Sequence, residues 1–217
     1  MASKVLRYEG EDITIAYDVG RCIHAAECAE GLPAVFDPQR KPWIDPDGAR
    51  PDRIAVVIHR CPSGALTYER LDGGAGEPIP EENVVRVDED GPLCLTGDIE
   101  LKGPDGSLIS TETRLTLCRC GHSNNKPFCD NSHKEAGFID DGSLGQGGVK
   151  IAPGLSDSIM SVKLNKNGSF VLAGEFRIEG SDGEEGRGTH AVLCRCGHSN
   201  NKPFCDGTHR AVDFVSE

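Results

Sequence analysis

Short alternating patterns of hydrophobic and polar residues run through the chain, and most of them predict β-strands. Alternation is clear at residues 4–8 and 13–17, and it returns in two later stretches, NVVRVDEDGPLCLTGDIEL and SIMSVKLNKNGSFVLAGEFRI. A period of two places apolar side chains on one face of a strand. One helix is expected at residues 53–60, where Pro51 and Asp52 provide a helix start. These patterns predict an α+β protein in which strands predominate.

The second half of the chain contains two copies of one small β unit. Thirteen residues, CRCGHSNNKPFCD, occur identically at 118–130 and 194–206. Before this loop, each copy predicts a strand, a Gly turn, a second strand, a polar Gly-rich excursion and a third strand, at 115–117 or 191–193. A unit this small buries little surface by itself. The two mostly-β units are therefore expected to pack as a pseudo-twofold pair, with both loops at one end.

Two stretches rich in Gly and Pro separate the units. They are LDGGAGEPIPEE at residues 71–82 and DGSLGQGGVKIAPGLSD at residues 141–157, and both have the composition of connecting loops. The predicted domains are a small N-terminal α+β domain at 1–72, a first repeat at 83–140 and a second repeat at 158–217.

The composition limits how much core the chain can build. Of 217 residues, 37% are hydrophobic and 5% aromatic, while Gly contributes 27 residues and Pro 13. Small cores of this kind usually need metal or disulfide cross-links, and ten cysteines are present. The first residues, MASKVLRYEGED, resemble neither a signal peptide nor a transit peptide, so a cytoplasmic location is expected. In a reducing compartment, cysteine clusters more often bind metal than form disulfides.

The charge narrows the possible partners. The formal net charge is −12, and phosphate binding requires clustered Lys and Arg, so nucleic acid is not expected. A basic protein partner is expected, although the acidity alone also keeps a protein in solution. No apolar stretch approaches the roughly 20 residues that cross a bilayer, so no membrane anchor is expected. No nucleophile–base pair or phosphate loop is recognisable, so an enzyme is not expected.

Each repeated loop carries three thiols and one closing imidazole within sixteen residues. Soft and borderline donors at this density predict a metal site. Structural zinc also accepts three Cys and one His, but its cysteines usually come as C-x2-4-C pairs, whereas these loops begin with C-x-C. An iron–sulfur cluster is the favoured interpretation. The candidate ligands are Cys118, Cys120, Cys129 and His133 in the first loop, and Cys194, Cys196, Cys205 and His209 in the second.

The loops resemble the CDGSH iron–sulfur family, also called NEET-type proteins. Both match the pattern C-x-C-x2-S-x3-P-x-C-D-x-[ST]-H, and the resemblance covers residues 83–217. The first copy has Asn131 where the family usually has Gly, and Asn is the residue next most tolerant of positive φ. The aspartates of the motif, Asp130 and Asp206, are expected to act as N-caps of the segments that carry the histidines.

This resemblance implies a 2Fe-2S cluster in each loop. Its ligand pairs would be Cys118 with Cys120 and Cys129 with His133, then Cys194 with Cys196 and Cys205 with His209. A neutral imidazole in place of one thiolate raises the reduction potential of a cluster. It also makes the cluster sensitive to acid, because a protonated imidazole cannot bind iron.

The N-terminal stretch RCIHAAECAEGLPAVF, followed later by CPSGAL, resembles a divergent single-cluster ferredoxin domain over residues 4–72. Cys22, Cys28 and Cys61 occupy ferredoxin ligand positions, but Ala25 stands where the middle cysteine is usual. Three thiolates suit a 3Fe-4S cluster. Alternatively, His24 or a non-protein ligand completes a 4Fe-4S cluster, or the domain has lost its cluster.

The leading functional hypothesis is an electron-transfer protein with two Cys3His 2Fe-2S clusters and one N-terminal 3Fe-4S or 4Fe-4S cluster. It would be a monomer with internal pseudo-symmetry that meets a redox partner through a basic docking surface on that partner. Two alternatives stay open. The chain is a carrier that donates 2Fe-2S clusters to apo-proteins, or it is a redox or pH sensor.

Overall fold

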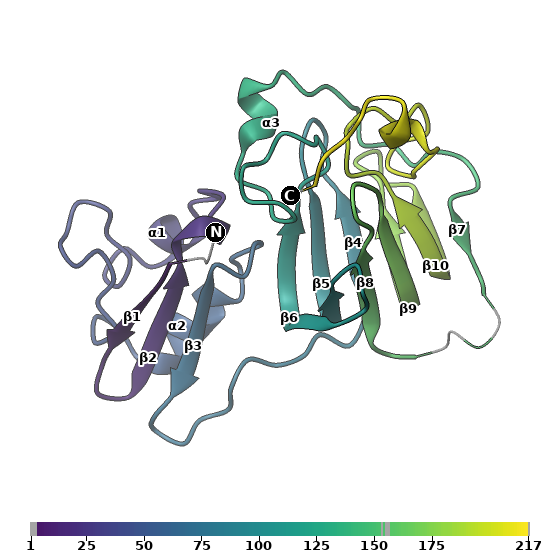
Figure 1. Cartoon of the computed structure of the whole chain (residues 1–217). Coiled ribbons are helices and arrows are strands. Elements are labelled where there is room, and N and C mark those ends of the chain that lie inside the picture. The colour runs from purple at the N-terminus through teal and green to yellow at the C-terminus, as the bar shows by residue number, and fades with distance from the viewer. Residues whose placement is uncertain (1–3, 153, 155–156, 217) are drawn as a thin grey trace. The chain divides into compact units, whose positions relative to one another are not determined.

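The computed structural model describes residues 4–152, 154 and 157–216. The chain divides into two compact units, Met1–Pro78 and Ile79–Glu217, and strands predominate over short helices (Figure 1). The predominance of strands agrees with the alternating patterns in the sequence. Each helix in the described part of the chain is too short or too polar to cross a membrane.

The N-terminal unit is a three-stranded antiparallel sheet with two short α-helices. β2 (Ile13–Asp18) lies between β1 (Val5–Glu9) and β3 (Leu66–Arg70), and the helices are α1 (Glu27–Gly31) and α2 (Pro51–Ile58). The predicted helix is confirmed, although it begins earlier than expected. The fixed φ of proline suits the first helical position, where a missing N–H costs nothing. The buried core of this unit includes Ile13, Ile15, Phe36, Ile44, Ile54, Ile58 and Leu66.

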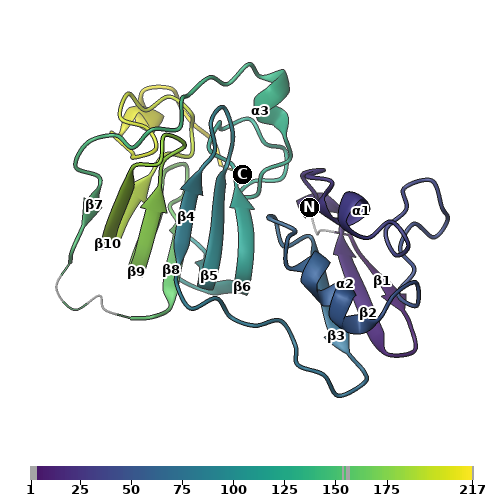
Figure 2. The same cartoon turned by 180° about the vertical axis from the view of Figure 1, so that it is seen from behind.

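The C-terminal unit is built on one seven-stranded sheet. Its strands are β4 (Val84–Val87), β5 (Leu93–Lys102), β6 (Leu108–Leu117), β7 (Val149–Lys150), β8 (Met160–Leu164), β9 (Phe170–Glu179) and β10 (Glu185–Leu193). The repeated loops follow β6 and β10 and emerge at the same end of the sheet (Figure 2). The first loop leads into α3 (Ser132–Glu135), and the second into a 3-10 turn at Thr208–Arg210.

The two repeats exchange their first strands. β4 pairs antiparallel with β5 of its own repeat and parallel with β9 of the other, while β8 pairs antiparallel with β9 and parallel with β5. The third strands pair within their own repeats, β6 with β5 and β10 with β9. Apolar side chains from both repeats therefore form one core, which includes Val85, Leu95, Leu101, Leu117, Val162, Leu172, Ile178 and Leu193.

Part of the expected pattern was wrong between the second and third strands of each repeat. The predicted Gly-rich excursion is mostly strand, because β6 and β10 begin well before the residues expected. Only the last four residues of β6 are buried, so its earlier half, LISTET, carries a polar sequence on an exposed strand. The predicted connector at 141–157 contains β7, which pairs with β10; its residues 153, 155 and 156 lie outside the described residues.

Asn83 ties the two repeats together just before β4. Its side-chain amide donates to the carbonyls of Ser158 (2.6 Å) and Glu175 (2.8 Å), and its Oδ1 accepts from the backbone N–H of Asp98 (2.8 Å). Asn83 is buried. A single side chain therefore satisfies backbone groups from both repeats at the point where their strands cross.

Replacing Asn83 should weaken the C-terminal unit specifically. In Asn83→Ala the two carbonyls and one N–H lose their partners inside the protein, and we expect the free energy of unfolding to fall by about 2–4 kcal/mol. Urea unfolding of the full chain measures this. Asn124→Ala, at an exposed position of the same unit, should change the stability by less than about 0.5 kcal/mol. Equal effects of the two substitutions would contradict the role given to Asn83.

Candidate metal centres

A backbone ladder closes each repeated loop. The N–H of Cys118 donates to the carbonyl of Pro127 (2.9 Å), and the N–H of Cys129 donates to that of Thr116 (3.0 Å). The second loop repeats both bonds, from Cys194 to Pro203 and from Cys205 to Val192, each at 2.8 Å. The returning part of the loop thus pairs with the end of β6 or β10. The third thiol of each loop is held near the strand that supplies the first.

The eight candidate ligands lie as four close pairs. The Sγ atoms are 3.6 Å apart in Cys118–Cys120 and 3.7 Å apart in Cys194–Cys196. The Nδ1 atom of each histidine lies close to a cysteine Sγ, at 3.6 Å for Cys129–His133 and 3.4 Å for Cys205–His209. Among the described residues, no three His, Cys, Asp or Glu side chains converge to hold a single ion. Donors grouped in twos suit a binuclear centre better than one zinc ion.

The two sites differ in exposure. Cys118, Cys120, Cys129 and His133 are all buried, and His133 is 7% exposed. In the second site Cys194 and Cys196 are buried, whereas Cys205 and His209 are half-buried. The Cys–His side of the second site is therefore the more accessible to solvent.

Hydrogen bonds within the first loop set the charge state of its thiols. The bond between Cys118 and Cys120 lowers the pKa of Cys118 to about 6 and raises that of Cys120. Burial raises the pKa of Cys129 to about 11, although the N–H of Asn131 donates to its sulfur (3.4 Å). One thiolate forms readily, and the remaining thiols give up their protons only when a cation compensates the buried charge.

Burial also favours the uncharged form of other ligands. It raises the pKa of Cys196 to about 11 and also raises that of Cys205. It lowers the pKa of His133. The imidazole of His133 is therefore neutral at neutral pH, which is the form that binds metal.

The aspartates of the motif act differently from the N-caps expected. The N-cap positions are Asn131 and Gly207, with left-handed φ values of 71° and 91° and no side-chain cap. Asp130 instead accepts from the backbone N–H groups of Asn124 (2.8 Å) and Ser132 (3.0 Å), so it joins the start of the loop to the histidine segment. The expected tolerance of Asn131 for positive φ is confirmed. The left-handed conformation at Asn131 precedes the segment that brings His133 close to Cys129.

Asp206 makes the equivalent link in the second loop. It accepts from the N–H groups of Asn200 and Thr208, both at 2.9 Å. A hydrogen bond from the Thr208 side chain and these two backbone bonds lower the pKa of Asp206 below its usual range. The carboxylate of Asp206 is therefore ionised in the folded loop at neutral pH.

The arginine inside each C-x-C was missed by the sequence reasoning. The fully buried Arg119 donates to the carbonyls of Gly91 (3.0 Å) and Asp88 (2.7 Å) and to the carboxylate of Asp140. The guanidinium also lies 5.0 Å from the ring centroid of Phe138. These bonds anchor the loop to the turn between β4 and β5. The sequence signal that could have revealed this role is that both copies have arginine between the two cysteines.

Arg195 has the same task in the second loop. It donates to the carbonyl of Asn165 (3.1 Å) and lies 4.8 Å from the ring centroid of Phe170. The loop is thereby attached to the turn between β8 and β9. Each C-x-C pair is thus held through its middle residue.

The two loops touch each other through a glycine of each. A Cβ atom at Gly121 would lie 2.6 Å from the carbonyl oxygen of Cys196, and one at Gly197 would lie 2.5 Å from that of Cys120. Both glycines have positive φ, 83° and 81°. The backbones of the two loops therefore lie in direct contact, with no room for a side chain at either glycine.

The remaining polar and sulfur residues near the loops have structural roles. Lys126 and Lys202 donate to carbonyls of their own loops, those of Ser123 (2.6 Å) and Ser199 (2.7 Å). Cys94 lies buried in β5, and burial raises its pKa to about 12. Cys94 is therefore a residue of the core, and a thiol with this pKa is inert at neutral pH.

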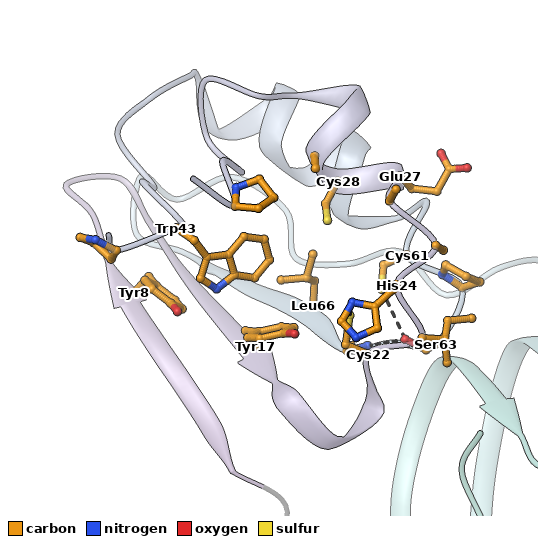
Figure 3. Close-up of a pocket in the computed structure, with 18 of the residues that line it drawn as sticks. Tyr8, Tyr17, Cys22, His24, Glu27, Cys28, Trp43, Cys61, Ser63 and Leu66 are labelled. Carbon is orange, nitrogen blue, oxygen red and sulfur yellow. Dashed lines mark hydrogen bonds between the residues drawn. The ribbon is translucent and has the colours of Figure 1, made fainter. Parts of the chain in front are cut away.

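In the N-terminal unit, the three cysteines that were expected to bind a cluster line one pocket of about 580 Å³ (Figure 3). Cys22 follows a 3-10 turn, Cys28 lies in α1 and Cys61 follows α2, and all three are partly exposed. Ala25 also lines the pocket. Three elements thus bring the thiols together around one cavity, with no fourth thiol among them.

His24 lies beside one of these thiols. Its Nδ1 is 4.0 Å from the Sγ of Cys22, and its side chain is exposed. One wall of the pocket is aromatic, with Tyr8, Tyr17 and Trp43, and Tyr17 lies next to Cys22 (Figure 3). Burial and a hydrogen bond with Cys22 raise the pKa of Tyr17, so its hydroxyl stays protonated.

Comparisons with known proteins bear on both units. Residues 8–71 match a family model described as divergent 4Fe-4S mono-cluster, and residues 90–134 and 167–210 match one described as iron-binding zinc finger CDGSH type. Over 61 residues the chain is 41% identical to the uncharacterized protein YjdI of Escherichia coli K12, and this match covers 28% of the chain and 80% of YjdI. YjdI of Escherichia coli O157:H7 matches equally. No solved structure matches the chain. Both resemblances read from the sequence are confirmed.

The contact between the loops predicts a strong effect of a small substitution. Gly121→Ala combines a positive φ with an overlap against backbone, and we expect it to lower the free energy of unfolding by about 3 kcal/mol. Gly106→Ala is the matched control, since its φ is 86° and nothing lies within 4 Å, and it should cost about 1 kcal/mol. Urea unfolding and visible circular dichroism of the two variants check this. Indistinguishable variants would show that the loops do not touch.

Proposed function

Because this chain belongs to the divergent 4Fe-4S mono-cluster family and carries two iron-binding CDGSH-type repeats, we propose that it transfers electrons through three iron–sulfur clusters. The observation that carries the proposal is the repeated pairing of the donors. Each loop presents one Cys–Cys pair and one Cys–His pair at 3.4 to 3.7 Å. Both loops belong to one sheet and touch each other, so two one-electron centres would lie close together.

The donor set of each loop fits a 2Fe-2S cluster. Cys118 and Cys120 would bind one iron, and Cys129 and His133 the other. When bound, such a cluster accepts and releases one electron. The chain supplies thiolates, one neutral imidazole and backbone N–H groups directed at sulfur, including that of His122 toward Cys120 (3.4 Å). Hydrogen bonds to ligand sulfurs and the loss of one thiolate charge both raise a cluster potential.

The second loop has the same set, with Cys194 and Cys196 on one iron and Cys205 and His209 on the other. The reciprocal strand pairings support the pseudo-twofold relation proposed for the two repeats, since β4 and β8 each join the opposite repeat. A related environment for both clusters would make their intrinsic potentials similar. The greater exposure of Cys205 and His209 then distinguishes the second site.

The N-terminal α+β domain would add a third cluster. Cys22, Cys28 and Cys61 suit three irons, giving 3Fe-4S, and a fourth ligand would complete 4Fe-4S. Their common pocket and the family match support a cluster at this position. We propose electron transfer without an enzymatic reaction of its own, and a redox partner whose docking surface is basic, because the chain has a formal net charge of −12.

The structure offers one observation in favour of the alternative role as a cluster carrier. His209 and Cys205 are half-buried, so the second site is open to attack by thiols of an acceptor protein. An imidazole ligand is also lost more easily than a thiolate. A cluster carrier would release its cluster from this accessible second site. An electron-transfer protein would pass electrons through the closed first site as well.

Kinetics separate the two roles. An electron-transfer protein should exchange electrons with a ferredoxin reductase while its iron content stays constant, and a carrier should move 2Fe-2S clusters to an apo-ferredoxin within minutes. If acidic charge guides the encounter, the electron-transfer rate should fall as the Debye length shortens from about 10 Å at 0.1 M salt to about 3 Å at 1 M. Stopped-flow absorbance at several salt concentrations measures this. Rapid cluster loss to the acceptor without electron exchange would favour the carrier.

Acid should remove the two 2Fe-2S clusters at different rates. Protons compete with iron for the imidazole as the pH falls below about 6.5, and the half-buried His209 is easier to reach than the buried His133. His209→Cys should therefore slow the fast phase of absorbance loss at about pH 5.5, and His133→Cys the slow phase. Each substitution should also lower the potential of its own cluster. Loss rates that do not change in either variant would contradict the ligand assignment.

A further inference from the structure

The pocket of the N-terminal unit is lined by the three thiols and by an aromatic wall of Tyr8, Tyr17 and Trp43, in which Tyr17 lies next to Cys22 (Figure 3). We propose that it binds a small anionic molecule, a thiolate or carboxylate with a flat apolar group, as the fourth ligand of the N-terminal cluster. This ligand would occupy the corner left open by Ala25. The inference rests on the proposed presence of a cluster held by Cys22, Cys28 and Cys61.

The side chain of Ala25 offers no donor atom to the corner of the cluster that the middle cysteine usually binds. Ala25 is exposed and lies between His24 and Ala26, which both have positive φ, 54° and 64°. Non-glycine residues in this conformation persist where the surrounding structure holds them, and they are concentrated at functional sites. The segment is therefore kept in a specific shape around a position that offers a cluster only a methyl group.

His24 is poorly placed to fill this corner. In a four-iron cluster each protein ligand binds its own iron. The Nδ1 of His24 lies 4.0 Å from the Sγ of Cys22, close to the 3.4 and 3.6 Å of the two Cys–His pairs proposed to share an iron. The side chain thus lies beside the corner that Cys22 would occupy, and a neighbouring corner stays open.

The aromatic wall can receive a flat apolar group. The rings of Tyr17 and Trp43 meet edge to face, with centroids 4.9 Å apart, and Phe36, which is buried and does not line the pocket, lies 6.1 Å from Trp43. Tyr8 and Leu66 complete this wall. The pocket volume of about 580 Å³ has to hold the proposed cluster as well as its ligand, so only part of it is left for the ligand. Aromatic side chains around such a cavity favour an aromatic over an aliphatic ligand.

The charge at the rim favours an anion. Lys41 and Arg40 both line the pocket. The guanidinium of Arg40 is held by the carbonyls of Ala34 (3.1 Å) and Val35 (2.7 Å) and also pairs with Asp45 (3.7 Å). Lys41 is therefore the main cationic group that favours an anion. The carboxylate of Glu27, on the side of α1, is directed away from the cavity (Figure 3). A thiol would bind as the thiolate and release its proton to solvent, whereas a carboxylate is already ionised at neutral pH.

Paired probes test the ligand class on the full chain, reconstituted with iron and sulfide without oxygen. Thiophenol is compared with ethanethiol, and benzoate with acetate, by the electron paramagnetic resonance spectrum of the reduced N-terminal cluster. We expect a saturable shift, with thiophenol binding about tenfold more tightly than ethanethiol. Trp43→Leu should reduce this ratio to about twofold or less. Equal affinities of the aromatic and aliphatic probes would overturn the role of the aromatic wall.

Ala25→Cys provides the matched control, because it restores a protein thiolate at the open corner. This variant should hold a 4Fe-4S cluster whose spectrum none of the four probes changes. His24→Ala should keep the cluster and the same response to thiophenol. If His24→Ala loses the cluster while the unaltered chain shows no response to any probe, the histidine fills the corner and the proposal is overturned.

Iron content distinguishes failure of this inference from failure of the proposed function. About four irons per chain would mean that the N-terminal cluster is absent, which contradicts the third centre of the proposed function. About seven irons, with a spin-half signal in the oxidised state, would indicate 3Fe-4S; thiophenol should then promote uptake of a fourth ferrous ion. If the chain holds about seven or eight irons and no probe changes the spectrum, the proposed ligand site is wrong and the proposed third cluster stands. The signals of the reduced 2Fe-2S clusters serve as the internal reference.

Discussion

The exchange of first strands between the two repeats is the constraint on which the C-terminal unit depends. The pairing of β4 with β9 and of β8 with β5 joins the strands of both repeats into one sheet. The buried side chains consequently form one core drawn from both repeats. Asn83 stabilises the crossing by bonding to Ser158, Glu175 and Asp98. Neither repeat is a complete folding unit without its partner.

This exchange also determines how the loops meet. β6 and β10 end at the same edge of the sheet, so the loops that follow them emerge together (Figure 1). Gly121 and Gly197 then allow the backbone of each loop to approach the carbonyl of a ligand cysteine in the other. Arg119 and Arg195 attach each loop to a turn of its own repeat. A pair of centres held this rigidly needs little rearrangement when the charge of one changes, which suits electron transfer.

The N-terminal unit arranges its cysteines differently from the two repeats. Its thiols are partly exposed and come from three separate elements around an open pocket, whereas the cysteines of the repeats are mostly buried within single loops. A closed site protects its ligands, and an open site admits molecules from solution. The site of the first repeat is therefore closed, the Cys–His side of the second site is half-buried, and the N-terminal pocket is open to solvent and small molecules.

The local chemistry could be read from the sequence alone. The spacing C-x-C, the closing histidine and the tolerance of Asn131 for positive φ are short-range properties, because residues two to four apart meet through the geometry of one turn. The close pairs Cys118–Cys120 and Cys129–His133 follow from that spacing. The alternating patterns likewise predicted the strands at 4–8 and 13–17 and the first two strands of each repeat, but neither β3 nor the early half of β6.

Only the tertiary structure decided the relations between distant residues. The pairing of β4 with β9, the contact of Gly121 with Cys196 and the partners of Arg119 join residues many positions apart. Such contacts depend on which faces pack together, and no local spacing encodes them. The aromatic wall of the N-terminal pocket is of the same kind, since Tyr8 of β1, Tyr17 of β2 and Trp43 of the segment after α1 meet only when these elements have folded around one cavity.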